Sequence, residues 1–356
     1  MMMIWIKSRF KCTQVDCRRF TVSPGFCAQG DCSVDVTNRQ RLARVFTRRD
    51  ILKALAVMGL SSSAFGGYAV ASSFQQSVTR YAITPPGWTP GLKLRLAILA
   101  DMHICEPWMS VARVEEIVRQ TNALGADAIL LLGDYVVGHR LGRYSTPVSA
   151  GDWASPLGQL KAPLGVHAIL GNHDWWDELE VQQRRAGPTR AGLALEAVGI
   201  PVYENKAVRL IKDSRPFWLA GLGDQWAFWP RAGEYDEFKR TGKKNYDGVH
   251  DLPGTLAQVT DDAPVILMAH EPDIFPKVPA RVALTLSGHT HGGQIRIFGY
   301  SPVVPSRYGN RFAYGHIIED HRHLIVSGGL GCSAMPIRFG SPPEIVVVDL
   351  GGEGVA

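Results

Sequence analysis

Five short apolar runs of the sequence each end in side chains that commonly bind metal ions. In chain order these side chains are Asp101 and His103, Asp134, Asn172, His270, and His289 and His291. The last pair stands in SGHTHGGQI, where two glycines follow two histidines spaced two apart. Histidine is the commonest metal ligand near neutral pH, and neither a buried strand nor a surface turn needs two imidazoles. The pattern therefore predicts a metal site built from several strand ends.

Seven candidate ligands are too many for one tetrahedral zinc ion, which takes four. They suit two metal ions of five or six ligands each that share a bridging carboxylate and a bridging water. The mixture of histidine nitrogen with carboxylate and amide oxygen favours Mn²⁺, Fe or Zn²⁺ over Ca²⁺ or Mg²⁺, and we expect Mn²⁺. Two ions roughly 3.5–4 Å apart bind the oxygens of a phosphoester, lower the pKa of the shared water and stabilise in-line attack on phosphorus. Phosphoester hydrolysis is therefore the predicted chemistry.

The apolar runs that carry these residues are typical of buried strands, because each is short, continuous and bounded by Gly or Pro. Helical patterns lie between them: one begins at Ser110, a good N-cap, and stops at Gly125, and a second over 189–199 stops at Gly199. Further strands are expected over 217–224, 323–329 and 344–350. Alternating strands and helices predict an α/β layer fold, in which ligands gather at the carboxyl ends of strands.

The composition fits a globular protein with a large core, since 46% of the 356 residues are hydrophobic and 20% are charged. The formal net charge of +5 is unevenly distributed. Residues 1–71 hold 11 Lys and Arg against 4 Asp and Glu, whereas the remaining residues hold 27 against 29. A nucleic-acid-binding protein carries its basic surface on the folded domain, so the near-neutral body predicts no nucleic-acid partner.

The segment over 47–71, TRRDILKALAVMGLSSSAFGGYAVA, resembles a twin-arginine export signal. Arg48 and Arg49 precede an apolar run that closes on Ala69-Val70-Ala71, a small-x-small site typical of signal cleavage. We expect the twin-arginine translocation machinery to export the folded chain, with cleavage near Ala71. Two alternatives stay open: an uncleaved membrane anchor, although Lys53 and the Gly and Ser content make a poor span, and a buried helix.

The domain boundaries follow from these patterns. We expect a disordered leader or a mis-assigned start at 1–46, the export signal at 47–71, a linker at 72–92, one large domain at 93–350 and a tail at 351–356. The leader holds four cysteines in two Cys-x4-Cys pairs, Cys12, Cys17, Cys27 and Cys32. Their spacing is not the two-to-four spacing usual in zinc sites, so the sequence assigns them no role.

The motifs DMH, GDYV, GNHD, AHEPD and GHTH, in this order between about Lys93 and Leu350, resemble the calcineurin-like metallophosphoesterase signature. GHTHGGQI, the downstream PIRFGSPPEIVVV and the leader are similar to bacterial exported phosphodiesterases related to the UDP-2,3-diacylglucosamine pyrophosphatases. The resemblance implies a four-layer αββα sandwich of two mixed β-sheets flanked by helices, with a dimetal site at the carboxyl ends of the strands.

The resemblance also implies roles for single residues. Asp101, His103 and His291 would bind one metal, Asn172, His270 and His289 the other, and Asp134 would bridge them. His173 would face the phosphate, where it steadies the transition state or protonates the leaving oxygen, and Asp174 would orient it. One position departs from the family pattern: Val137 stands where a carboxylate often supports a ligating histidine, so that support must come from elsewhere.

These observations predict a dimetal hydrolase of phosphodiester or pyrophosphate bonds, acting on small-molecule or lipid-linked substrates of the cell envelope, nucleotides included. Tryptophans near the motifs, Trp175, Trp176, Trp226 and Trp229, suit an acyl chain, a nucleobase, a membrane surface or simply the core. The expected location is the periplasm or cell envelope. The alternatives are a phosphomonoesterase or protein phosphatase and, outside the enzymes, a metal-binding envelope protein without turnover.

Overall fold

The computed structural model describes residues 66–230 and 246–352. The predicted leader over 1–46 with its four cysteines, the twin arginines and most of the tail lie outside these residues. Within the two described ranges, no helix has both the length and the apolar character needed to cross a membrane. A helical stretch over 66–72 and the following residues precede the first strand.

The first of two large sheets is mixed and has the strand order β1-β13-β2-β4-β6. Its strands are β1 (Ser77–Ile83), β13 (Glu344–Leu350), β2 (Leu94–Leu99), β4 (Ala128–Leu131) and β6 (Val166–Ala168). Strand β13 runs parallel to β1 and antiparallel to β2, while β2, β4 and β6 are parallel to one another. Residues 72–92 are therefore not the linker that was predicted, because β1 pairs with β13 along seven residues and belongs to this sheet.

The second large sheet is also mixed, with the order β11-β12-β10-β9-β8-β7. Its strands are β11 (Gly315–Glu319), β12 (Arg322–Val326), β10 (Val282–Ser287), β9 (Val265–Met268), β8 (Arg215–Gly221) and β7 (Lys206–Lys212). The four inner strands are parallel, and β11 and β7 pair antiparallel at the two edges. A small antiparallel pair joins β3 (Cys105–Glu106) to β5 (Thr146–Pro147).

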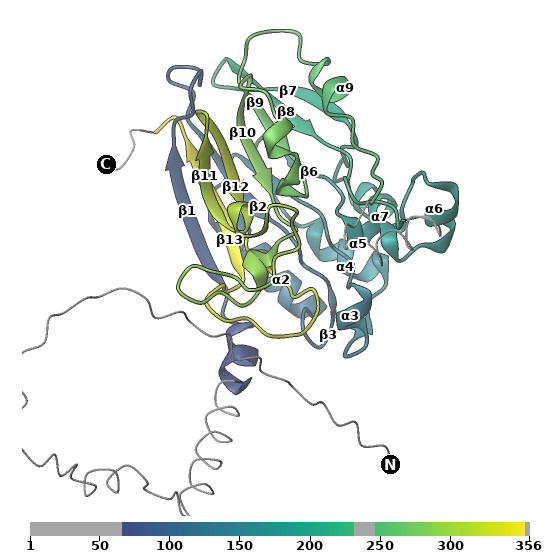
Figure 1. The fold of residues 1–356 in the computed structure, drawn as a ribbon. Helices are drawn as coiled ribbons and strands as arrows, with labels where there is room; N and C mark the ends of the chain where they lie inside the picture. Colours follow the sequence, from purple (N-terminus) through teal and green to yellow (C-terminus); the bar gives the residue numbers. More distant parts are fainter. Residues whose placement is uncertain (1–65, 231–245, 353–356) are drawn as a thin grey trace, which may run out of the picture. The chain divides into compact units, whose positions relative to one another are not determined.

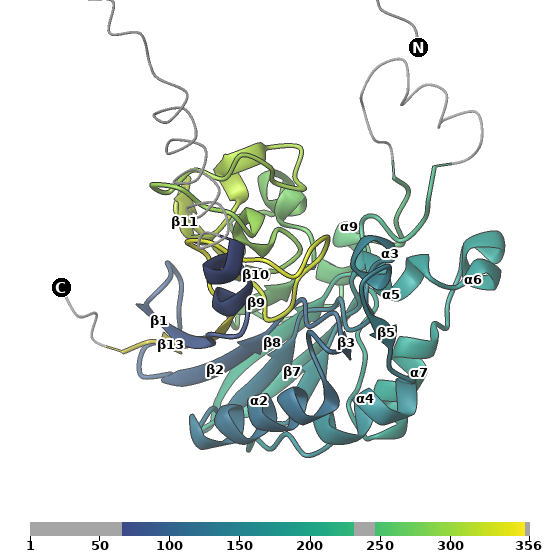
Figure 2. The ribbon, with the colours of Figure 1, turned by 90° about the horizontal axis from the view of Figure 1, so that it is seen from below.

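Helices cover the outer faces of both sheets (Figures 1 and 2). The first sheet carries α2 (Val111–Ala123), α4 (Ala150–Leu157) and α7 (Arg190–Ala197), and the second carries α9 (Leu252–Leu256) and the 3₁₀ helix η2 (Pro272–Lys277). Shorter elements are α3 (His139–Gly142), α5 (Asn172–Trp176), α6 (Leu179–Arg184), η3 (His291–Gly293) and η4 (Gly309–Phe312). The helix predicted to begin at Ser110 does so, since the Ser110 hydroxyl accepts a hydrogen bond from the Arg113 amide at 3.3 Å.

The core has three apolar layers. Leu96, Ile98 and Leu130 of the first sheet face Ile266 and Leu284 of the second, and all five are at most 1% exposed. One further layer lies under α2, α4 and α7, and the other under α9 and η2. Strands buried on both faces need continuous apolar runs, which explains their recognisable sequence. The four-layer αββα sandwich is confirmed.

The sheets bring the polar strand ends together. β2, β4 and β6 of the first sheet and β9 and β10 of the second are parallel within their sheets, and each is followed within five residues by candidate ligands. Carboxyl ends of parallel strands share one edge of a sheet, so five separate stretches of chain meet at one place.

Candidate metal centre

All seven predicted ligands lie just after the carboxyl ends of strands from the two sheets, in two groups that share Asp134. The first group contains Asp101, His103, Asp134 and His291, and the second contains Asp134, His270 and His289. In each group the potential ligand atoms lie within 4.8 Å of one another, and every member is buried. Asn172 joins the second group, because its Oδ1 lies 2.8 Å from Nδ1 of His289.

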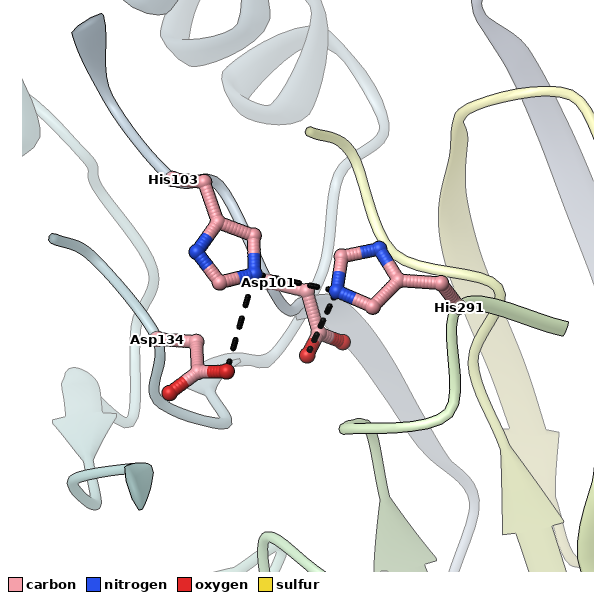
Figure 3. A group of neighbouring side chains, drawn as sticks. All are labelled: Asp101, His103, Asp134 and His291. Carbon is pink, nitrogen blue, oxygen red and sulfur yellow. Dashed lines mark hydrogen bonds and ion pairs between the residues drawn. The ribbon is translucent and has the colours of Figure 1, made fainter. Parts of the chain in front are cut away.

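The first group surrounds a small space at the ends of β2, β4 and β10 (Figure 3). Nε2 of His103 lies 2.9 Å from Nε2 of His291 and 3.6 Å from Oδ2 of Asp134. Nε2 of His291 lies 3.6 Å from Oδ1 of Asp101. Two nitrogens and two carboxylates thus point toward one centre.

The donor atoms of this group fit a metal ion. Oδ2 of Asp101 is buried and has no hydrogen-bond partner among the described residues. A buried carboxylate oxygen without a partner is costly unless a cation or a donor satisfies it. A divalent ion between the oxygen and the facing imidazoles would satisfy all of them, and nitrogen with oxygen ligands suits Mn²⁺, Fe or Zn²⁺.

Backbone carbonyls orient two of the imidazoles. Nδ1 of His103 lies 2.9 Å from the carbonyl of Val136, and Nδ1 of His270 lies 2.7 Å from the carbonyl of Leu132. A proton on Nδ1 leaves Nε2 free as a ligand, which is the usual arrangement of metal-binding histidines. Val136 therefore supplies the support that Val137 lacks, and Val137 instead packs with Leu141 in a small buried cluster.

The backbone is strained at most of these positions. Asp101, His103, Asp134, His289 and His291 all have positive φ, between 45° and 68°. Side chains other than glycine rarely adopt this left-handed conformation, and when they do the strain is typically found at functional sites. Five of seven candidate ligands therefore hold conformations that only the surrounding packing maintains.

A glycine allows two of the ligands to approach. A Cβ at residue 171, before α5, would come within 2.5 Å of both Oδ1 of Asp134 and Cε1 of His270. Contacts under 3 Å would displace one of these side chains, so Gly171 is required by the shape of the site.

His173 stands beside the first group without belonging to it. Its ring meets that of His103 edge to face at 4.9 Å, and its amide donates to Oδ1 of Asp134 at 2.9 Å. A Cβ at Gly138 would lie 2.2 Å from Cε1 of His173, so the loop after β4 closes tightly over this ring. His173 therefore lies next to the first group, and neither ligand group among the described residues includes it.

Asp174 acts on the backbone around it. Its Oδ2 accepts hydrogen bonds from the amides of Asp134 at 2.8 Å and Gly171 at 2.9 Å. Its Oδ1 accepts from the amides of Tyr135 at 2.9 Å and Val136 at 3.2 Å. These four bonds join the loop after β4 to the start of α5. Asp174 therefore holds the loop after β4 against the start of α5, the helix that carries His173.

Burial and mutual charge set the protonation of the site before metal binds. Burial raises the pKa of Asp101 to about 7, with the Asp134 carboxylate adding to the rise. Burial alone would also raise the pKa of Asp134, but His270 and His173 hold it well below its usual range. Burial holds the pKa of His289 well below its usual range, so that this ring is neutral and ready to bind a cation.

This electrostatic arrangement predicts that metal affinity rises with pH. Below pH 7 a proton on Asp101 competes with the metal, so the Mn²⁺ concentration for half saturation should rise about tenfold per pH unit below pH 7. In the metal-free protein the folded chain holds the Asp101 proton more tightly than the unfolded chain does, because the pKa of this carboxyl is raised in the fold. The free energy of unfolding should therefore fall as pH rises from about 4 to about 7. Equilibrium dialysis at pH 5.5, 6.5 and 7.5 measures the affinity. An affinity that does not change with pH would contradict the ligand role of Asp101.

Two buried acidic residues near the site were not predicted from the sequence. Asp224 and Glu271 lie with His270 in a third group, and burial raises the pKa of both carboxyls. Glu271 Oε2 accepts from the Gln225 amide at 3.1 Å, and Gln225 Nε2 donates to the Glu271 carbonyl at 2.7 Å. These contacts hold the loop after β8 next to the site. The available signal was that Asp224 follows the end of β8 by three residues and that Glu271 directly follows the predicted ligand His270.

A cavity of about 380 Å³ opens beside the two groups, with one aromatic wall. Trp176 stacks on Tyr246 at 5.3 Å between ring centroids and packs against Trp229 at 4.3 Å. Trp226 stacks on the same tyrosine at 4.9 Å and meets His289 edge on at 4.6 Å. Of the four tryptophans predicted near the motifs, three line the cavity: Trp176, Trp226 and Trp229. Trp175 is instead buried in the core under α7.

The fold and the two groups that share one carboxylate define a metal-dependent phosphoesterase, a hydrolase. Residues 94–293, more than half of the chain, match the calcineurin-like phosphoesterase family model, and the chain belongs to this family.

Two relatives from bacteria agree with this assignment. The chain is 27% identical to the uncharacterized metallophosphoesterase YkuE of Bacillus subtilis over 315 residues, covering 85% of this chain and 97% of the relative. It is 28% identical to the phosphodiesterase YaeI of Escherichia coli over 319 residues, covering 86% of this chain and all of the relative. A solved dimetal phosphatase from Danio rerio aligns with TM-score 0.35 at 13% identity, covering 67% of this chain and 88% of that one.

Proposed function

We propose that the protein hydrolyses phosphodiester or pyrophosphate bonds with two divalent metal ions, Mn²⁺ by preference. The observation that carries this proposal is Asp134, whose carboxylate belongs to both ligand groups. A shared carboxylate places two ions side by side, which is the arrangement suited to in-line displacement at phosphorus. The similarity to a named phosphodiesterase supports the diester preference.

The chain's own residues would divide the work as follows. Asp101, His103 and His291 would hold one ion, Asn172, His270 and His289 the other, and Asp134 both. When bound, the ions would supply Lewis acidity toward the phosphate and an acidified water. His173 lines the cavity next to these ligands, where its imidazole can donate a proton to the leaving oxygen or a hydrogen bond to the phosphate. Asp174 would hold the loop after β4 against the start of α5.

The cavity supports a substrate with a phosphate and a large apolar or planar group. Arg140 and Arg143, both exposed, line it together with His173 and can meet a second phosphate. Trp229 is 40% exposed, so part of its ring remains available to a ligand. Aromatic surfaces bind acyl chains and nucleobases alike, and both lipid-linked and nucleotide substrates fit this proposal.

The proposed setting is the bacterial cell envelope. The twin-arginine motif supports export of the folded, metal-loaded chain by the twin-arginine translocation machinery. The same aromatic side chains suit contact with a membrane surface, which would bring lipid-linked phosphoesters to the site.

The test compares hydrolysis of bis(p-nitrophenyl) phosphate and p-nitrophenyl phosphate by the full chain with Mn²⁺, using metal-stripped protein as the control. We expect strong cleavage of the diester that disappears without metal. Cleavage of the monoester alone would replace the proposal with a phosphomonoesterase. Two bound ions without turnover of either ester, or of a pyrophosphate-linked nucleotide lipid, would indicate a metal-binding envelope protein.

A further inference from the structure

A short hairpin that follows the candidate ligand His291 ends in a tight turn. The amide of Ile297 donates to the carbonyl of Tyr300 at 2.8 Å, and the amide of Tyr300 donates back at 2.9 Å. Between them Phe298 and Gly299 have φ of 49° and 81°. Two-residue turns with positive φ at both positions favour Asn or Asp before Gly. A phenylalanine is strained there, and because its side chain is fully exposed, the turn itself gives no reason for an aromatic residue.

Further exposed apolar side chains gather around this turn. Four more of them, on the hairpin loop and on the loop after β12, are between 45% and 76% exposed: Ile297, Tyr300, Val303 and Met335. The side chain of Gln294 joins the two loops, because it donates to the carbonyl of Met335 at 3.0 Å and accepts from the amide of Ser333 at 2.8 Å. These four residues and Phe298 form the apolar tip. Exposed apolar groups gathered in one place mark a surface that binds a protein or a membrane.

The charge of the two loops favours an anionic partner. Residues 294–318 and 327–343 contain four arginines and no Asp or Glu. Arg307 and Arg311 are exposed, although Arg311 pairs with Glu319 at 2.7 Å. Apolar side chains that enter the acyl region and arginines that contact headgroups are together typical of binding to anionic lipid. The tip therefore suits the surface of an anionic bilayer.

The helical stretch over 66–72 lies at the same face of the domain (Figure 1). The amide of Phe339 donates to the carbonyl of Gln294 at the base of the hairpin at 2.8 Å, and the ring of Tyr68 meets that of Phe339 edge on at 5.8 Å. In the sequence this stretch continues the apolar run of the predicted export signal, a type of segment that enters a membrane during export. The apolar tip thus lies on the side of the domain where the chain would meet a membrane.

The loops that carry the apolar tip also line the cavity beside the metal groups. Pro305 follows Val303 by two positions, and Ser333 and Ala334 directly precede Met335. Pro305, Ser333 and Ala334 all line the cavity. A bilayer that receives the tip would therefore lie close to the cavity.

We propose that the apolar tip docks the protein on an anionic lipid bilayer, with Phe298 among the acyl chains and the neighbouring arginines at the headgroups. Docking presents the cavity to phosphoesters held in that bilayer. The proposal deepens the proposed action on lipid-linked substrates and rests on it, but lipid binding is measured without turnover.

The first experiment measures how much of the full chain sediments with vesicles of equal parts phosphatidylglycerol and phosphatidylcholine. Burial of a phenylalanine side chain contributes about 10–100-fold to a binding constant, so Phe298→Asn should weaken binding by that factor. Asparagine suits the turn, so the melting temperature should stay the same or rise. Leu193→Gln, which removes an exposed apolar side chain from α7, is the matched control and should bind as the unaltered chain does. All variants share residues 1–65, so a difference between them reports on the tip.

Hydrogen exchange locates the contact. With vesicles present, the amides over 295–303 should exchange severalfold more slowly, while those of α7 should not change. Equal exchange of the hairpin with and without vesicles would overturn the proposal, as would undiminished binding by Phe298→Asn. Equally strong binding to phosphatidylcholine alone would overturn the role of the arginines. Self-association of the unaltered chain without lipid, if Phe298→Asn abolished it, would assign the tip to a second copy of the chain instead.

A soluble substrate separates this surface from the metal centre. Phe298 is not among the residues that line the cavity, so Phe298→Asn should keep full turnover of bis(p-nitrophenyl) phosphate while it loses lipid binding. Equal loss of both would overturn the assignment of Phe298 to lipid docking alone. Failure of the unaltered chain to cleave this diester would count against the proposed function, whereas failure to bind vesicles would count against the docking surface.

Discussion

Replacing Asp134 by alanine should abolish phosphoester hydrolysis and remove metal from both sites. Asp134 is the one residue common to the two ligand groups, its Oδ2 lies 3.2 Å from Nε2 of His270 and 3.6 Å from Nε2 of His103, and it is 1% exposed. Its loss withdraws a charged ligand from each ion and leaves His270, whose pKa Asp134 raises against the effect of burial, without its main counter-charge.

The expected loss of turnover is at least about a thousandfold. Metal ions contribute several kcal/mol to the stabilisation of charge in such transition states. Since each 1.4 kcal/mol corresponds to a factor of ten, losing about 4 kcal/mol gives this figure. The measurements are bound Mn²⁺ per chain and the rate with bis(p-nitrophenyl) phosphate.

Two further variants complete the test of Asp134. Asp134→Asn retains an oxygen for the His173 amide, which donates to Oδ1 at 2.9 Å, and should preserve the fold while losing metal affinity. Asp262→Ala removes an exposed carboxylate and should match the unaltered protein in both measurements. If Asp134→Ala bound two ions and kept its turnover, Asp134 would not bridge the metals.

The candidate ligands were predictable because their signal is local. An apolar run buried on both faces, ended by a histidine or an aspartate, identifies both the strand and the edge at which it delivers a ligand. His270 after β9 and Asp101 after β2 lie 169 positions apart in the sequence. Both were nevertheless predicted from the same pattern, an apolar run that ends in a metal-binding side chain. The packing of α2 was predictable for the same reason, because the Ser110 cap and the apolar positions after it are neighbours in the chain.

The supporting contacts were not predictable because their signal is not local. Asp174 binds amides that lie up to 40 positions earlier in the chain, and the carbonyl that faces Nδ1 of His270 belongs to Leu132, 138 positions away. Backbone carbonyls and amides are present at every residue, so no side-chain pattern marks the carbonyl of Val136 as the partner of His103.

Strand order depends on pairing that composition does not encode. The predicted linker over 72–92 includes β1, whose alternation of half-buried and exposed residues in the structure corresponds to no continuous apolar run in the sequence. β1 belongs to the first sheet through its pairing with β13, which lies more than 260 positions away in the sequence. An edge strand with one solvated face has a weaker apolar signal than a central strand, and this position explains the error.

Replacing His173 by asparagine should leave both metal ions bound and lower turnover by about 10²- to 10⁴-fold, the usual contribution of a positioned acid or base. His173 is not in either ligand group, but its ring lies 4.9 Å from that of His103 and lines the cavity next to Asp134. Asparagine keeps a hydrogen-bonding amide but cannot deliver a proton as imidazolium can. Metal content per chain and turnover of diesters are the measurements, and His321→Asn, at an exposed position, is the control.

The leaving group distinguishes the two roles open to His173. A residue that protonates the leaving oxygen matters more when that oxygen is a poor leaving group, so an alkyl diester should lose more turnover than a p-nitrophenyl diester. A residue that steadies the phosphate through a hydrogen bond should cost both substrates the same factor, because the charge on the phosphate is common to both. Unchanged turnover with both substrates would remove His173 from the chemistry and leave it a packing role under Gly138. A loss of bound metal in His173→Asn would instead make His173 a part of the metal centre itself, although neither ligand group includes it.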